Sequence, residues 1–232
     1  MYFCDTLSIP NLNIPDSIRF LKNEIPGHVS IVAVSKTKPV SDIMQAYLAG
    51  LRIFGENKVQ ELVQKQSQLP SDIEWHFIGH LQTNKVKYIA PFIHLIHGID
   101  SEKLLEEINK EALKHDRIID CLLQFYIATE ETKFGLNLGE AKALLDSERY
   151  RKMKNIRITG VMGMSSFSDD AGLVRREFKS LHDYFLDLQS TYFRGEGYFK
   201  HLSMGMSGDY RIAIEEGSTL VRLGTIIFGD RT

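Results

Sequence analysis

The chain has 232 residues, of which 43% are hydrophobic and 25% are charged, so it is long enough to bury a sizeable core. Its 28 basic and 30 acidic side chains leave a formal charge of -2, which does not favour a nucleic-acid or membrane surface. The two cysteines, Cys4 and Cys121, lie far apart outside any Cys/His cluster, which argues against a disulfide framework or a zinc site. We therefore expect a cytoplasmic globular protein with neither a leader peptide nor a membrane span.

A short helix over residues 15–25 is predicted to precede the first strand, because proline is tolerated in a first helical turn and apolar residues recur at helical spacing. The strand that follows, residues 31–36, consists mainly of small and β-branched residues, which suits a strand covered on both faces. It ends in Lys36, and Pro39 then stops it. On this stretch alone, the simplest interpretation of Lys36 is a solvated strand end.

The alternation of strand and helix recurs along the rest of the chain. Helices are predicted at residues 40–49, 59–67, 84–90, 102–115, 139–145, 173–188 and 209–216, and further strands at residues 52–55, 75–78, 94–97, 118–128, 156–162, 199–204 and 220–223 with 226–228. This rhythm predicts an α/β parallel sheet, and eight units of this size predict a TIM (β/α)8 barrel. We expect one domain over residues 1–232, with residues 1–27 as a helical extension. A doubly wound open sheet is the alternative, weakened because no GxGxxG follows the first strand.

Polar and glycine-rich segments follow most of the predicted strands, and in a barrel these segments share one rim. Ser207 and Asp209 open a predicted helix, where backbone N–H groups favour an anion. Gly224 and Thr225 follow the last strand and let a second backbone segment approach the same point. Because the loops after strands seven and eight form the usual phosphate site of this fold, we expect a phosphate there. Taken singly, these residues could equally be helix caps and a bulge.

Other polar residues on the predicted strands have less specific interpretations. Arg222 lies in an otherwise apolar strand, so its guanidinium either pairs with a core carboxylate or reaches a ligand. Asn57 alone is most simply a turn residue. His76, His80 and His97 do not show metal spacing on one element, so we expect them to be rim or core hydrogen-bonding residues and predict no metal site.

A lysine amine, a phosphate cradle and an arginine on one rim suit pyridoxal 5'-phosphate (PLP). The amine would form a Schiff base, the cradle would hold the phosphate, and another group would face the ring nitrogen. An aldolase or decarboxylase that uses a lysine Schiff base on a phosphorylated substrate needs nearly the same groups, so that alternative stays open.

Six ordered motifs resemble those of the pyridoxal phosphate homeostasis proteins. They are AVSKTKP at residues 33–39, FGEN at 54–57, WHFIGHLQTNK at 75–85, KFG at 133–135, LSMGMS at 202–207 and VRLGTIIFG at 221–229. Their order and spacing match from residue 31 to the end of the chain. That family is similar in fold to the N-terminal barrel of alanine racemase and of eukaryotic ornithine decarboxylase.

The resemblance implies a cofactor-binding set made of Lys36, Asn57, Ser207, Arg222, Gly224 and Thr225. In that set Lys36 would carry PLP as a Schiff base, Ser207, Gly224 and Thr225 would bind its phosphate, Arg222 would face the pyridine nitrogen, and Asn57 would lie beside the ring. A permanent cation at that nitrogen opposes protonation of the ring and so discourages carbanion chemistry. The chain also stops soon after the last predicted strand, so we expect the cofactor half of a racemase-like site without the catalytic half.

The predicted function is therefore that of a cytoplasmic, non-catalytic protein of intracellular PLP homeostasis. It would bind the cofactor reversibly, buffer it and pass it to PLP-dependent apoenzymes, and we assign no catalytic residue. The alternative is a low-activity, PLP-dependent amino-acid racemase. We expect a monomer, and Lys38, Lys85 and Lys133 are secondary or transfer-site candidates whose simplest interpretation is a solvated charge. The recipient enzymes and the affinity for PLP do not follow from the sequence.

Overall fold

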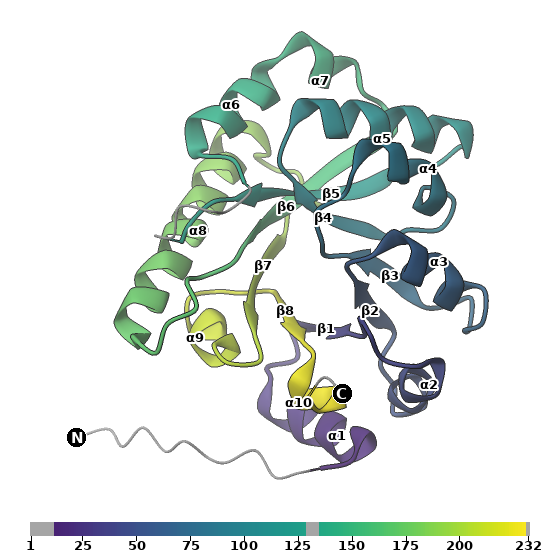
Figure 1. Cartoon of the computed structure of the whole chain (residues 1–232). Helices are drawn as coiled ribbons and strands as arrows, with labels where there is room; N and C mark the ends of the chain where they lie inside the picture. Colours follow the sequence, from purple (N-terminus) through teal and green to yellow (C-terminus); the bar gives the residue numbers. More distant parts are fainter. Residues whose placement is uncertain (1–11, 129–134, 231–232) are drawn as a thin grey trace.

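Eight parallel strands close into a barrel in the computed structural model, which describes residues 12–128 and 135–230 (Figure 1). Neighbours along the chain pair in order, and β1 pairs with β8 to complete the circle. The predicted TIM barrel is thereby confirmed, and the doubly wound alternative is wrong. The strands are β1 (Ser30–Val34), β2 (Ile53–Glu56), β3 (Glu74–Phe77), β4 (Leu95–Ile99), β5 (Ile119–Phe125), β6 (Ile156–Gly163), β7 (His201–Met206) and β8 (Leu220–Leu223).

The helices surround the barrel on its outside, as Figure 1 shows. They are α1 (Ile14–Glu24), α2 (Val40–Leu48), α3 (Val59–Gln66), α4 (Val86–Ile89), α5 (Glu102–Lys114), α6 (Leu138–Asp146), α7 (Glu148–Lys152), α8 (Ala171–Tyr192), α9 (Tyr210–Glu215) and α10 (Thr225–Phe228), with a 3₁₀ turn η1 (Thr83–Lys85) before α4. The predicted N-terminal helix is confirmed as α1, whose Asn13 side chain accepts a hydrogen bond from the Asp16 N–H. Among the described residues, no helix combines the length and the apolar character that crossing a membrane requires.

Two apolar cores hold these layers together. The larger one lies between the sheet and the helices and includes the fully buried rings of Phe54, Phe77 and Phe178. The smaller one fills the inside of the barrel and consists of Val32, Leu95, Leu122, Met162 and Leu220. Both faces of the strands are therefore buried, which explains why most strand segments consist of near-continuous apolar runs.

Two differences from the predicted elements have local causes. Residues 226–228 are not part of the last strand but lie in α10, because the backbone leaves the sheet at Gly224 and the apolar side chains pack beside α1 instead. Helix α7 was not predicted because five residues, ERYRK, carry no apolar period. Its start depends on the Ser147 side chain, which accepts a hydrogen bond from the Tyr150 N–H.

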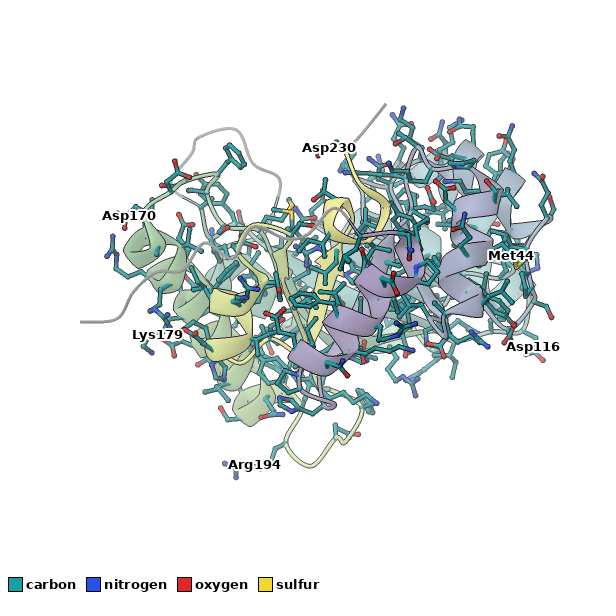
Figure 2. All side chains as sticks on the ribbon, turned by 90° about the horizontal axis from the view of Figure 1, so that it is seen from below. Met44, Asp116, Asp170, Lys179, Arg194 and Asp230 are labelled. Carbon is teal, nitrogen blue, oxygen red and sulfur yellow. The ribbon has the colours of Figure 1, made fainter. Side chains whose placement is uncertain are left out.

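The two ends of the barrel carry different connections. Figure 2 places Asp170 and Asp230, which follow strands β6 and β8, at one end of the molecule, and Asp116 and Arg194, which precede β5 and β7, toward the other. The first end is the rim to which the carboxyl ends of all strands point. Lys36 follows β1 and therefore belongs to this rim, where the fold places its functional loops.

A glycine in β6 allows a bulge in the barrel wall. The pairing of β5 with β6 shifts register between Cys121 and Leu122, whose partners are Ile158 and Gly160. Gly160 has φ of 155°, and a Cβ atom added to it would lie 1.8 Å from the carbonyl oxygen of His201 on β7. Only glycine fits there, because both the backbone angle and the contact exclude a side chain.

Replacing this glycine is expected to weaken the barrel strongly. Gly160→Ala should lower the free energy of unfolding by roughly 3 kcal/mol, because strand β7 would have to move away from β6. Gly197→Ala is the matched control, since Gly197 has no atom within 4 Å of its added Cβ. Urea unfolding followed by circular dichroism measures both, and equal midpoints for the two variants would contradict this account of the bulge.

Candidate functional site

Lys36 lies in a tight turn directly after the buried end of β1. Ser35 before it is fully buried, while Lys36 itself is half-buried at the rim. Thr37 after it has φ of 66°, a left-handed conformation that is uncommon for a residue other than glycine. Such a turn persists only where neighbouring groups hold it.

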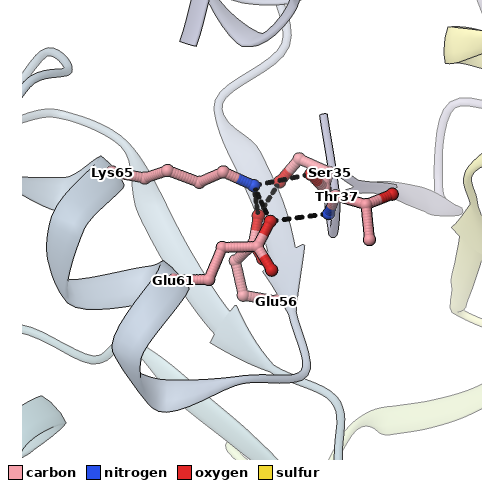
Figure 3. Close-up of polar contacts among 5 residues, drawn as sticks. All are labelled: Ser35, Thr37, Glu56, Glu61 and Lys65. Carbon is pink, nitrogen blue, oxygen red and sulfur yellow. Dashed lines mark hydrogen bonds and ion pairs between the residues drawn. The ribbon is translucent and has the colours of Figure 1, made fainter. Parts of the chain in front are cut away.

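Hydrogen bonds and ion pairs join this turn to β2 and α3. We call the residues that make them the Lys65 cluster: Ser35, Thr37, Glu56, Glu61 and Lys65 (Figure 3). The three N–H groups of the Lys65 ammonium have three acceptors, namely the Ser35 carbonyl at 2.7 Å, Glu56 Oε1 at 2.7 Å and Glu61 Oε1 at 2.6 Å. Ser35 Oγ donates to Glu56 Oε1 at 2.6 Å, and the Thr37 N–H donates to Glu61 Oε1 at 2.6 Å. The residues on both sides of Lys36 are therefore fixed to one group of charges.

Two of the three charges in this cluster are buried, so each of the two needs an oppositely charged partner. The side chains of Lys65 and Glu56 are only 7% and 0% exposed. Burial raises the pKa of the Glu56 carboxyl, although its hydrogen bonds with Lys65 and Ser35 act in the opposite direction. Sequence reasoning missed Lys65, since a lysine near the end of a short amphipathic helix ordinarily predicts a solvated charge.

The loops after β7 and β8 meet at the rim on which Lys36 lies. The Gly224 N–H donates to Ser207 Oγ at 3.3 Å. A Cβ atom on Gly224 would lie 3.4 Å from Val34, so this backbone runs close against the end of β1. Thr225 follows as the first residue of α10 and is exposed. The structure thus brings Ser207, Gly224 and Thr225 to the rim that carries Lys36.

Asp209 has a different role from the helix cap that the sequence suggested. Its side chain makes no cap hydrogen bond to α9, which begins at Tyr210 and has only six residues. Its two carboxylate oxygens instead accept from the Met206 N–H at 2.5 Å and from Ser165 Oγ at 2.7 Å. Asp209 therefore joins the loop after β7 to the loop after β6, and the short helix adds little to an anion site.

Asn57 directly follows β2, the strand that pairs with β1. Val34 of β1 pairs with Gly55 of β2, so Lys36 and Asn57 each stand two residues beyond the same pair. Gly79, which follows β3, packs so closely that a Cβ on it would lie 2.7 Å from the Asn57 carbonyl oxygen. The backbone at Asn57 therefore lies in close contact with the segment that follows β3.

Arg222 is buried inside the barrel below this rim. Its Nη1 donates to Ser203 Oγ at 2.7 Å and its Nη2 to the Gly163 carbonyl at 3.1 Å, and these two bonds engage two of its five N–H donors. Within residues 12–128 and 135–230 no carboxylate forms an ion pair with it, although the charge of Asp209 acts on it. The predicted alternative of a core carboxylate partner is therefore wrong for the described residues. Burial lowers the pKa of Arg222 to about 10, which leaves the guanidinium cationic at neutral pH.

Two buried histidines continue this polar contact through the barrel. Ser203 Oγ lies 3.0 Å from His97 Nδ1, and His97 Nε2 lies 3.0 Å from His76 Nδ1. Burial holds the pKa of both imidazoles well below its ordinary value, so both rings are neutral near pH 7. The prediction of core hydrogen bonding is confirmed for this pair. His80 lies at the rim instead, 3.3 Å from a carboxylate oxygen of Asp100.

The secondary lysines have individual positions. Lys38 Nζ donates to the Phe228 carbonyl at 3.0 Å and to the Asp230 carbonyl at 2.7 Å, so it joins the turn after β1 to the end of α10. Lys85 lies 5.8 Å from the centre of the Tyr88 ring. Lys133 lies outside the described residues. Lys38 is thus a structural contact rather than a solvated charge.

Comparisons with known proteins agree with this architecture. The family model of the alanine racemase N-terminal domain matches residues 13–232. Alanine racemase of Bartonella henselae shares the fold, with a TM-score of 0.70 and 17% identity over 94% of this chain and 58% of its own.

Similarity to a narrower group is much higher. PipY of Synechococcus elongatus, solved without PLP, superposes with a TM-score of 0.86 at 32% identity, over 94% of this chain and 100% of its own. The same protein with PLP bound gives a TM-score of 0.83. A protein of Aquifex aeolicus named pyridoxal phosphate homeostasis protein is 41% identical over 202 residues, which are 87% of this chain and 86% of the relative. The chain therefore belongs to the family of pyridoxal phosphate homeostasis proteins, which is built on the alanine racemase N-terminal domain.

Proposed function

We propose that this protein binds PLP reversibly through Lys36 and serves to buffer the cofactor and deliver it to PLP-dependent apoenzymes. The observation that carries the proposal is the meeting of the Lys36 turn with the Ser207 and Gly224 loops on one rim, above the buried cation of Arg222. The names of the relatives and the PLP-bound structure of PipY support it.

The residues present fit this cofactor chemically. PLP supplies an aldehyde that condenses with an amine, with loss of water. The Lys36 amine is held on a fixed turn, Ser207 and Thr225 offer hydroxyl donors to a phosphate, and Gly224 leaves the space that a Cβ atom would occupy. Lys36 and Asn57 each follow the paired residues Val34 and Gly55 by two positions. Asn57 would therefore contact the ring from the side.

The charge of Arg222 supports a binding role rather than catalysis. A guanidinium that faces the pyridine nitrogen and stays cationic at neutral pH opposes protonation of that nitrogen. An unprotonated ring withdraws electrons weakly, so the protein would hold the cofactor without activating a bound amino acid. We therefore propose a non-catalytic protein.

Three further properties of the chain are part of the proposal. A single domain over residues 1–232 is supported by the family match, which extends from residue 13 to residue 232. A monomeric state and a cytoplasmic location stay predictions from the sequence, which size-exclusion chromatography with light scattering and cell fractionation would test.

Lys36→Ala should abolish covalent binding of PLP. We expect the visible absorbance of the loaded protein to disappear in this variant, and borohydride reduction to leave no phosphopyridoxyl mass on the peptide that contains residue 36. Lys58→Ala is the matched control, because Lys58 is an exposed lysine on the same rim and should leave both signals unchanged. An unchanged spectrum in Lys36→Ala would reject Lys36 as the anchor, and a trapped mass derived from a sugar would favour an aldolase.

The alternative of a racemase is suggested by the fold that this protein shares with alanine racemase, and it has a separate test. With PLP added, the wild-type protein should show no sustained racemisation across the common amino acids, since the Arg222 cation discourages loss of the α-proton. Chiral chromatography of the amino acids measures this. Multiple turnovers that vanish in Lys36→Ala would show an enzyme and reject the non-catalytic proposal.

Lys65→Met should loosen the turn that carries Lys36. Removing the ammonium leaves Glu56 buried without its cation, and breaking a buried pair in this way typically costs about 3–5 kcal/mol in unfolding free energy. The double variant Glu56→Gln with Lys65→Met removes both charges and should recover much of that loss. Chemical unfolding measures the stability, and the rate of PLP loading measures the turn. Equal stability of wild type and Lys65→Met would contradict the cluster's role.

A further inference from the structure

Three potential metal ligands meet at the end of the barrel opposite Lys36. Glu74 is the first residue of β3, His76 lies two residues further on the same strand, and His94 directly precedes β4. The His94 N–H donates to the Trp75 carbonyl at 2.9 Å, which fixes His94 beside β3. Two of the three residues therefore lie on β3, and the third lies at the start of the strand that pairs with it.

We propose that Glu74, His76 and His94 bind a divalent transition-metal ion. One ligand atom from each residue lies within 4.8 Å of the other two. His94 Nε2 is 3.5 Å from Glu74 Oε2, and the rings of His76 and His94 have their centroids 5.7 Å apart. The site lies away from the rim that carries Lys36, so it stands independently of the proposed cofactor function.

One of the three separations is close to that which a metal ion requires, and the other two lie within 4.8 Å. Bonds of about 2.0–2.1 Å to zinc place two donors of a tetrahedral site about 3.3 Å apart. The Glu74–His94 contact already has nearly this length. The side chains of Glu74 and His94 are 46% and 51% exposed, so both can rotate toward His76, which is held in the core.

His76 distinguishes this cluster from an ordinary surface ion pair. The residue is only 3% exposed, and its Nδ1 contacts His97, so Nε2 is the ring atom that remains for an ion. A surface pair of glutamate and histidine needs no second imidazole beneath it. Here the buried ring supplies a fixed ligand, and the two exposed side chains would close over the ion.

The partners of His76 also match the outer shell of a metal site, in which a ligating histidine donates its second N–H to a hydrogen-bond acceptor. With a metal on Nε2, the His76 Nδ1–H donates to His97 Nε2, and His97 carries its own proton on Nδ1. That proton is donated to Ser203 Oγ, which also accepts from Arg222 and has lone pairs for both. One tautomeric arrangement thus gives each hydrogen bond from His76 to Arg222 one donor and one acceptor.

The donor set selects the class of ion. Two imidazoles and one carboxylate suit Zn²⁺ and its neighbours Co²⁺ and Ni²⁺, whereas Mg²⁺ and Ca²⁺ prefer oxygen ligands alone. Three protein ligands leave at least one coordination position for water. The sequence did not reveal the site, because its histidines come from two different strands and show no spacing on one element.

Zinc titration of the full chain, after removal of metals with a chelator, tests the proposal. We expect one Zn²⁺ per chain by calorimetry, and a rise in melting temperature with Zn²⁺ concentration because the ion binds only the folded state. His94→Ala and Glu74→Gln should each weaken binding at least about tenfold, the lower end of the effect of disturbing a metal site. Substituting Co²⁺ should give visible absorption bands of an imidazole-ligated ion in the wild type, and much weaker bands in His94→Ala and Glu74→Gln.

His80→Ala is the matched control. His80 also faces a carboxylate, Asp100 at 3.3 Å, but at the other end of the barrel and outside the proposed site. Its removal should leave zinc binding unchanged. The proposal is overturned if the wild type takes up no zinc. It is also overturned if His94→Ala and Glu74→Gln bind zinc as tightly as the wild type, or if His80→Ala weakens binding as much as they do, because the bound ion would then be adventitious.

Discussion

The pairing of β1 with β8 is the constraint on which the candidate site depends. Val32 of β1 lies opposite Arg222 of β8, and Gly224 packs against Val34 at the carboxyl end of the same pair. Because the barrel must close, the lysine turn after the first strand and the glycine after the last become neighbours although about 190 residues separate them. No local signal near Lys36 could bring these groups together, and an open sheet would have kept them apart.

The Lys65 cluster supplies what barrel closure alone does not, namely a fixed direction for the turn. A threonine at positive φ costs free energy, and its N–H is used by a charged acceptor rather than by a strand partner. The three acceptors around Lys65 come from the turn after β1, from β2 and from α3, so loosening any one of these segments disturbs the others. The strained turn is therefore held by the Glu61 carboxylate, which is itself paired with the buried Lys65 ammonium.

Much of the fold was predictable because the apolar periods of strands and helices are long and regular. The sequence failed where tertiary contacts override local pattern. The apolar residues 226–228 read as a strand, but α1 offers them another surface to cover. The rim residues Lys36, Ser207 and Gly224 could be placed together because a parallel barrel aligns all strand ends. Lys65 and His94 could not, since each acquires its partners only when separate elements pack, and no feature of their own neighbourhood marks them.

The polar chain inside the barrel connects these observations. Among the described residues, the inner apolar core consists of five buried side chains, which offer no hydrogen-bond acceptor to a cation. The buried guanidinium of Arg222 therefore donates to Ser203 and to a backbone carbonyl. Ser203 in turn fixes His97, and His97 fixes His76, so the proton positions along the barrel depend on one another. Arg222 stays charged at one end of this series of hydrogen bonds, and His76, whose Nε2 takes no part in it, lies at the other. The buried cation of Arg222 is thus linked, through Ser203, His97 and His76, with the opposite end of the barrel.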